Sequence, residues 1–290
     1  MSPKGIRRLT DLTRKSLVVL CVLLIVFPIY WMFLTSIRPL QESISVPPRV
    51  LPDPSTVTLK HYQRILSGRI AALDVSYGLP TFFMNSLIVG AMTTVLSAAL
   101  STFAGYALVR LRFAGWRLIS HLIMICYLIP GIALMVPVFV LAVQLHLNNS
   151  LTGLILVQAA GNLPLSIWML KAYFKALPEE VDEAAIIDGC GWLRVVTRII
   201  IPIAKPGIMV VCFYSFLGSW NAFALPSVMI NDDKFRTVTL GLAMYLHQDL
   251  RSSWGEMMAA AVITLVPIFA MFVYFQRYIV GGLTLGAVKG

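Results

Sequence analysis

Charged side chains are scarce in this chain of 290 residues. Asp, Glu, Lys and Arg together make up 12% of it, whereas soluble domains carry about 25%. Apolar residues make up 58%. A chain so poor in charge cannot cover a soluble globule with polar surface, so the composition excludes the soluble class and indicates a protein embedded in a lipid bilayer.

Six stretches lack charge altogether. Each contains no Asp, Glu, Lys or Arg and is long enough to cross a hydrocarbon core, which takes roughly 20 apolar residues. The sequence therefore predicts an all-α polytopic membrane protein with six transmembrane helices. The predicted spans are 16–36, 82–109, 118–143, 151–170, 207–230 and 257–276.

Basic residues outnumber acidic ones, and the formal net charge is +10. Most of the 23 Lys and Arg residues fall on one side of the membrane if the N-terminus is cytoplasmic. Because positive charge accumulates in cytoplasmic loops, the pattern predicts that both termini are cytoplasmic and argues against nucleic acid as a partner. Residues 1–15 then form a cytoplasmic segment. The apolar run after them is too long for a secretory signal, and no cleavage site follows it.

Patterns typical of enzymes and metal sites are also missing. The four cysteines lie in predicted spans or in an inside loop, so no disulfide framework is expected. The four histidines lack the spacing of metal ligands, and no nucleophilic or paired-carboxylate constellation is present. The glycine-rich C-terminus has no Gly-Lys-Ser/Thr, which a P-loop needs to hold phosphate and magnesium. We therefore expect no enzyme activity, no metal and no cofactor in this chain.

Residues 16–290 are predicted to form one six-span domain with three extramembrane segments. The external segment 37–81 is rich in proline in its first part, and a short helix is predicted over 59–68, with a poorly ordered loop as the alternative. The other two segments are a cytoplasmic loop, 171–206, and a cytoplasmic C-terminal tail, 277–290.

The loop 171–206 carries the most specific pattern. A Leu-Pro pair followed by acidic residues begins a short predicted helix, since proline and carboxylates both favour the first helical turn. Gly189 and Gly191 end this helix, and a second helix is predicted over 192–201. The predicted product is a helix–turn–helix that projects from the inside face.

These residues resemble the EAA loop of permease subunits of binding-protein-dependent ABC importers. That loop has the spacing E-A-A-x3-G-x9-I-x-L-P, and this chain departs from it by Ile201 in place of Leu. In the family, the first helix docks in a cleft of an ATPase subunit. A solvated carboxylate is the alternative for Glu183 alone, but the complete spacing favours coupling. The predicted ATPase-coupling residues are Glu183, Ala184, Ala185, Asp188, Gly189, Ile199 and Pro202.

Two further stretches resemble the maltose-type carbohydrate permeases, and the resemblance covers the chain from the first span onward. They are residues 83–87, at the entry to the second span, and residues 275–290. In that branch the tail reaches toward the ATPase pair, while a frayed basic end is the alternative. The resemblance implies a type I permease fold in a bacterial plasma membrane. It also implies a second homologous permease subunit, two ATPases that bind ATP and magnesium, and an external solute-binding protein.

Polar residues within and beside the spans are weaker candidates for contact with solute. Amides and an aromatic ring suit a sugar, but interhelical hydrogen bonding and packing explain the same residues. In relatives, the outer connection between the fifth and sixth spans faces the binding protein. The pathway candidates are Gln158, Asn162, Trp220 and Asn221, and the binding-protein candidates are Tyr245, Gln248, Asp249 and Trp254.

Together these patterns predict half of the translocation pathway of an ATP-driven sugar or oligosaccharide importer, moved by ATPases through the EAA loop. One alternative is import of another solute such as glycerol 3-phosphate, for which Arg or Lys is expected in the pathway. Another is an ion-coupled secondary transporter, for which ionisable residues in the spans and inverted repeats are expected. The predicted spans contain no charged residue, and the two halves show no obvious inverted symmetry.

Overall fold

The computed structural model describes residues 3–39, 42, 50–67, 77–245 and 250–287. In these residues all regular structure is helical, in agreement with the predicted fold class. The chain divides into two compact units, one made of residues 1–78 and 242–265 and the other of residues 79–241 and 266–290.

The first unit contains α1, α3 and the start of α14. The hydroxyls of Ser36 and Tyr62, 2.7 Å apart, tie α3 to the end of α1. An ion pair of 3.1 Å between Arg64 and Glu256 ties α3 to α14. The short helix predicted over 59–68 is thus present and packed. The bounds are α1 (Pro3–Ser36), α3 (Lys60–Leu66) and α14 (Leu250–Ala287), the last of which continues into the second unit.

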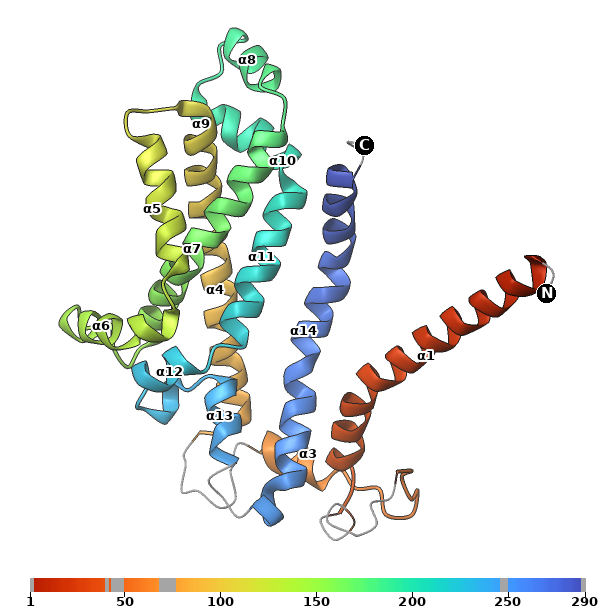
Figure 1. Cartoon of the computed structure of the whole chain (residues 1–290). Helices are drawn as coiled ribbons and strands as arrows, with labels where there is room; N and C mark the ends of the chain where they lie inside the picture. The colour runs from red at the N-terminus through yellow and green to blue at the C-terminus, as the bar shows by residue number, and fades with distance from the viewer. Residues whose placement is uncertain (1–2, 40–41, 43–49, 68–76, 246–249, 288–290) are drawn as a thin grey trace. The chain divides into compact units, whose positions relative to one another are not determined.

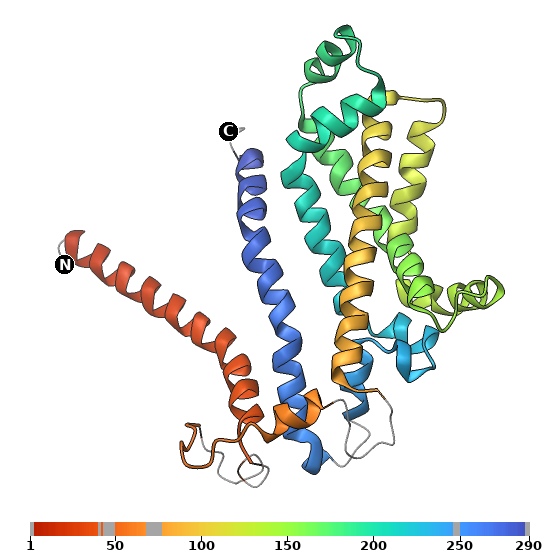
Figure 2. The same cartoon turned by 180° about the vertical axis from the view of Figure 1, so that it is seen from behind.

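The second unit is built around α4, α7 and α11, which run side by side (Figures 1 and 2). Glycines allow their close approach. A Cβ on Gly90 of α4 would lie 3.0 Å from the Phe216 ring of α11, and one on Gly105 would lie 3.3 Å from Leu170 of α7. The bounds are α4 (Leu79–Tyr106), α7 (Leu151–Ala176) and α11 (Lys205–Trp220).

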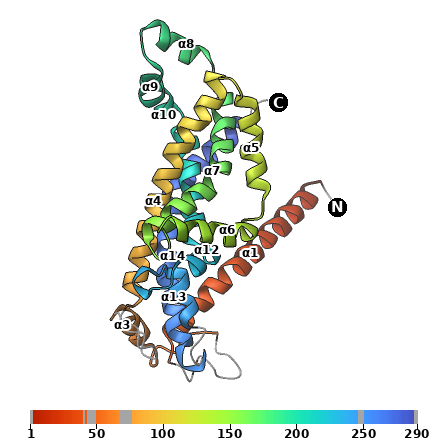
Figure 3. The ribbon, with the colours of Figure 1, turned by 90° about the vertical axis from the view of Figure 1, so that its left-hand side faces the viewer.

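Two predicted spans are not continuous helices. The span predicted over 118–143 is divided into α5 and α6, which meet at 102° (Figure 3). Pro130 accounts for this break because it forces Ile129 into an extended conformation and has no N–H to donate. The span predicted over 207–230 is divided into α11 and α12. The bounds are α5 (Trp116–Leu128), α6 (Gly131–Gln144) and α12 (Ala224–Met229).

The described residues contain four helices that are long and apolar enough to cross a membrane. They give up to six spans if each of two bent helix pairs counts as one span. One pair is α5 with α6, and the other joins residues 192–203 to α11 at 81°.

A short segment after α12 packs against the start of α4 within the second unit. The Asn85 amide donates to the carbonyls of Lys234 and Arg236, at 2.8 and 2.9 Å. The Ser86 hydroxyl accepts from the N–H of Val238 at 2.8 Å. The segment contains η3 (Asp233–Phe235) and α13 (Val238–Met244), whose last residues belong to the first unit.

Candidate functional site in the loop between α7 and α11

The loop between α7 and α11 begins with a short helix, α8 (Glu180–Ile187), at one end of the three-helix bundle (Figure 1). Three carboxylates lie in its first turn and complement the helix dipole. At its other end, Gly189 has a φ of +83°. The N–H groups of Gly189 and Cys190 donate to the carbonyls of Ile186 and Ala185 and so close the helix. The predicted helix and its glycine turn are therefore both present.

Gly189→Ala is expected to lower the free energy of unfolding by about 1 kcal/mol, because a side chain is strained at positive φ. Gly191→Ala is the matched control. An added Cβ meets nothing within 4 Å at either position, but only Gly189 has positive φ. Thermal unfolding in detergent measures both. Equal melting temperatures for the two variants would contradict the role of the turn.

The second half of the loop is a helical segment of three parts. The sequence predicted a helix over 192–201, and the structure extends it to Ile203. A turn at Ala204 then leads into α11. The parts are α9 (Trp192–Val195), the π-helical turn η2 (Val196–Ile200) and α10 (Ile201–Ile203).

An apolar core holds both halves of the loop against the bundle. Ala185 of α8 is 6% exposed and belongs to this core. Ile199 packs against it and is half-buried. The loop is therefore a packed part of the second unit. The other buried members are Ala98, Tyr106, Leu170, Phe174, Val195, Val196, Ile200, Ala204 and Val211.

The two faces of α8 differ. Ala185 and Asp182 point into the protein, whereas Glu183 and Ala184 are exposed. Ile187 is 84% exposed and was not singled out by the sequence. The outward face thus offers a carboxylate, a small residue and a large apolar side chain to a partner. Two other predicted coupling residues, Asp188 and Pro202, are also exposed.

A buried ionic cluster joins α8 to the end of α4, and the sequence did not single it out. Its centre is Arg110, which lies in the π-helical turn η1 (Ala107–Leu111) directly after α4. Nε of Arg110 lies 2.7 Å from Oδ2 of Asp182, and Nη1 lies 3.2 Å from Oε1 of Glu179. The Tyr106 hydroxyl donates to Oδ1 of Asp182 at 2.8 Å. We call Tyr106, Arg110, Glu179 and Asp182 the Arg110 cluster.

The centre of the Arg110 cluster is buried. The side chains of Arg110 and Asp182 are 6% and 5% exposed. By contrast, the neighbouring pair of Arg112 and Glu179, at 3.1 Å, is 63% and 53% exposed. Exposed ion pairs contribute little to stability, whereas buried ones respond strongly to loss of one partner. Loss of the Arg112 side chain is therefore expected to change stability little.

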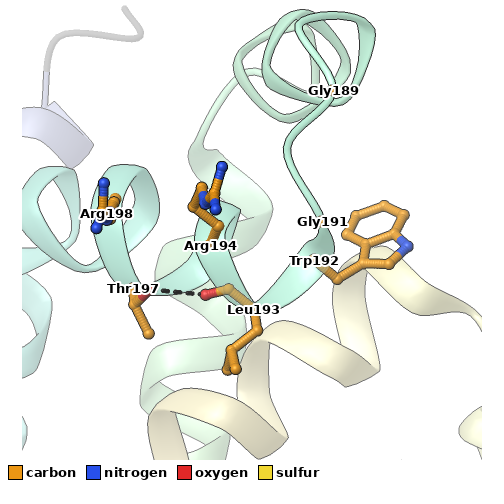
Figure 4. A pocket seen from close by; sticks show the side chains of 7 residues that line it. All are labelled: Gly189, Gly191, Trp192, Leu193, Arg194, Thr197 and Arg198. Atoms are coloured by element: carbon orange, nitrogen blue, oxygen red, sulfur yellow. Dashed lines mark hydrogen bonds between the residues drawn. The ribbon is translucent and has the colours of Figure 1, made fainter.

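An open hollow of about 570 Å³ lies between the end of α8 and the helical segment after it (Figure 4). Arg194 and Arg198, one turn apart, are exposed beside it and form no ion pair with the described residues. The Thr197 hydroxyl donates to the Leu193 carbonyl at 2.7 Å. The remaining lining residues are Gly189, Gly191 and Trp192.

Two of the pathway candidates face the interior of the three-helix bundle. The side-chain oxygen of Gln158 accepts a hydrogen bond from the Ser219 hydroxyl. Trp220 is 2% exposed, and its ring lies 5.5 Å from the rings of both Phe83 and Phe216. For Gln158 and Trp220, the sequence allowed either contact with solute or packing between helices. Their surroundings in the structure match packing between helices.

The other two pathway candidates are less enclosed. Asn162 is half-buried on α7. Asn221 is exposed directly after α11, where its amide donates to the Leu217 carbonyl at 3.0 Å. The structure therefore does not bring the four candidates together on one exposed face.

The candidates for binding-protein contact belong to the first unit. Tyr245 is 1% exposed, and burial, with the Glu256 carboxylate nearby, raises the pKa of its phenol. Trp254 is half-buried. Gln248 and Asp249 lie outside the described residues. Of the two candidates that the structure describes, Trp254 presents side-chain surface and Tyr245 does not.

Comparisons with known proteins give a consistent result. The family described as binding-protein-dependent transport system inner membrane component matches residues 97–284. The chain is 34% identical to the inner membrane ABC transporter permease protein YcjP of Escherichia coli, over 93% of this chain and 94% of that protein. It is 33% identical to the trehalose/maltose transport system permease protein MalG of Thermococcus litoralis, over 94% of each chain.

Two more comparisons concern a further relative and the fold. The chain is 33% identical to the diacetylchitobiose uptake system permease protein DasC of Streptomyces coelicolor, over 92% of each chain. A crystal structure of a bacterial ABC transporter involved in the import of the acidic polysaccharide alginate matches with a TM-score of 0.78 at 19% identity. That match covers 96% of this chain and 98% of the other. It confirms the importer-permease fold.

Proposed function

Because this chain belongs to the family of inner membrane components of binding-protein-dependent transport systems, we propose that it is a permease subunit of an ATP-driven carbohydrate importer. Members of the family work with ATPase and binding-protein partners. The substrate class is inferred from the relatives. Over more than nine tenths of its length, the chain matches permeases named for trehalose, maltose and diacetylchitobiose. The proposed solute is accordingly a sugar or oligosaccharide.

The proposed complex contains this subunit, a second homologous permease subunit, two ATPases and an external solute-binding protein. ATP and magnesium bind to the ATPases, since this chain lacks a P-loop. The chain itself is a conduit and lever without catalysis. Its predicted spans carry no Lys or Arg, which supports a neutral solute over glycerol 3-phosphate.

The lever in this proposal is α8, which lies on the cytoplasmic side. Its exposed face, with Glu183, Ala184 and Ile187, would dock in the ATPase, where a small residue allows close approach and a carboxylate adds an ionic contact. Its buried face is already packed against the bundle. Closure of the ATPases around ATP would move α8 and open the pathway outward, and hydrolysis would reverse this.

Glu183→Ala is expected to reduce binding-protein-stimulated ATPase activity and uptake by about tenfold, the scale of a typical coupling energy. The measurement uses the purified complex in lipid, with and without its binding protein, and a panel of disaccharides beside glycerol 3-phosphate. Gly189→Asp changes the turn after α8 and is a second variant that is expected to reduce the same two activities.

Glu180→Ala removes an exposed carboxylate from the same helix and is the matched control. Wild-type stimulation and uptake in both Glu183→Ala and Gly189→Asp would show that α8 is only a connection. Stimulation by glycerol 3-phosphate and by none of the sugars would overturn the proposed substrate class.

A further inference from the structure

The covalent connections of α8 are poorly suited to carry its movement. On one side, Leu177 is extended and is followed by Pro178, so no helix continues from α7 into α8. On the other side, the chain passes through Gly189 and Gly191, around which an added Cβ meets nothing within 4 Å. Both connections can act as hinges. A displacement of α8 therefore needs a side-chain connection to reach the membrane helices as a rigid movement.

Arg110 contacts both α8 and the chain segment that connects α7 to α8. Its guanidinium donates to the carbonyls of Leu177, at 2.8 Å, and Pro178, at 3.4 Å. It also forms ion pairs with Glu179 and with Asp182. One side chain at the end of α4 thus holds the hinge before α8 and the first turn of α8 together.

Tyr106 completes the attachment of Asp182 to α4. It donates a hydrogen bond to Oδ1, while Oδ2 lies 2.7 Å from Nε of Arg110, so one hydrogen bond and one ion pair hold the carboxylate. The Tyr106 ring is itself held between Phe174 of α7, 6.0 Å away, and Trp192 of α9, 6.4 Å away. The position of Asp182 is consequently fixed by α4 and, through the tyrosine ring, by α7 and α9.

The place of Arg110 in a π-helical turn adds a second observation. Single π-helical turns are rare and frequently occur at functional sites. Here the turn lies between the packed body of α4 and Arg112, whose φ is +43°. It presents Arg110 to the interior and Arg112 to the surface, as their exposures of 6% and 63% show.

We propose that Arg110 and Asp182 are positioning residues that carry the movement of α8 into α4. This inference rests on the proposed coupling function of α8. The guanidinium connects α8 to a helix that packs along α7 and α11, so a push on α8 displaces the bundle as one body. Without this connection only apolar packing, including that of Ala185, would hold α8 against the bundle, so α8 would turn more easily about its two connections and ATP would be hydrolysed with less transport.

The first test measures the geometry of the permease complex without ATP. Spin labels are placed at Glu180→Cys, an exposed position of α8 outside its proposed docking face, and at Val95→Cys on α4, which is 63% exposed, after the four native cysteines are replaced. Arg110→Gln, and separately the isosteric Asp182→Asn, are expected to broaden the distance distribution between the labels. Arg112→Ala is the matched control and is expected to leave it narrow. A narrow distribution in both cluster variants would overturn the inference.

The second test measures solute transported per ATP hydrolysed in lipid vesicles. Arg110→Gln and Asp182→Asn are expected to lower this ratio by about tenfold while the complex stays assembled. Arg112→Ala is expected to keep the wild-type ratio. Wild-type ratios in assembled complexes of both cluster variants would overturn the inference. An inert Glu183→Ala would count against the proposed coupling function, whereas the label distances do not depend on that result.

Discussion

Gly153→Ala is expected to lower the free energy of unfolding by about 3 kcal/mol or more, the upper range for overpacking. A Cβ on Gly153, in the first turn of α7, would lie 1.8 Å from the carbonyl oxygen of Leu147. That contact is with backbone, so no rotamer change relieves it. Either α7 or the turn before it has to move.

Hydrogen bonds hold the turn before α7 on several sides, so displacing this turn costs free energy. The Ser150 hydroxyl donates to the Leu147 carbonyl at 2.9 Å and accepts from the N–H of Gly153 at 3.1 Å. Asn149 accepts from the N–H groups of Asn231 and Asp232, at 3.1 and 2.9 Å. A shift of the turn would therefore break contacts on both sides.

Gly161→Ala is the control, because Gly161 lies in the same helix and an added Cβ there meets nothing within 4 Å. Alanine also favours a helix by roughly 0.5–1 kcal/mol over glycine, so this variant is expected to be at least as stable as the wild type. Yield in detergent and thermal unfolding measure both variants. A wild-type melting temperature for Gly153→Ala would contradict the close approach.

The sequence predicted the membrane helices well where length and composition alone decide. Residues within the predicted spans 16–36, 82–109, 151–170 and 257–276 form single helices because a bilayer demands long apolar segments. The effect of each proline was not predictable. Pro164 lies within the continuous helix α7, whereas Pro130 separates α5 from α6. Whether a proline bends or ends a helix depends on neighbours that the sequence does not place.

In the candidate site too, the sequence predicted the features that depend on adjacent residues and missed those that depend on distant ones. Local spacing predicted α8 and the turn at Gly189, since helix starts and glycine ends are properties of adjacent residues. The Arg110 cluster was missed because Tyr106 and Asp182 are separated by 76 positions in the chain. The proposed docking face also differs in part from the residues that the sequence named. The sequence predicted Ala185 as a coupling residue and did not single out Ile187, whereas the structure buries Ala185 and exposes Ile187.

Asp182→Ala is expected to lower the free energy of unfolding by about 3–5 kcal/mol, because it leaves a buried guanidinium without its nearest carboxylate. Arg110 is 6% exposed, so bulk water solvates its charge poorly when Asp182 is removed. Glu179, at 3.2 Å, compensates only in part because it is half exposed. Thermal unfolding in detergent is the measurement. Asp188→Ala, which removes an exposed carboxylate next to α8, is the control and is expected to change stability by less than about 0.5 kcal/mol.

Stability and coupling are expected to separate when the cluster is replaced by apolar groups. In the triple variant Tyr106→Phe, Arg110→Met and Asp182→Leu no buried charge remains at the cluster centre, and such replacements are often neutral or stabilising. This variant is expected to regain at least about half of the stability that Asp182→Ala loses. It is not expected to regain transport per ATP, because an apolar contact lacks the directional bonds from Arg110 to the Leu177 and Pro178 carbonyls. A triple variant that is stable and fully coupled would show that packing alone, without the ion pair, transmits the movement of α8.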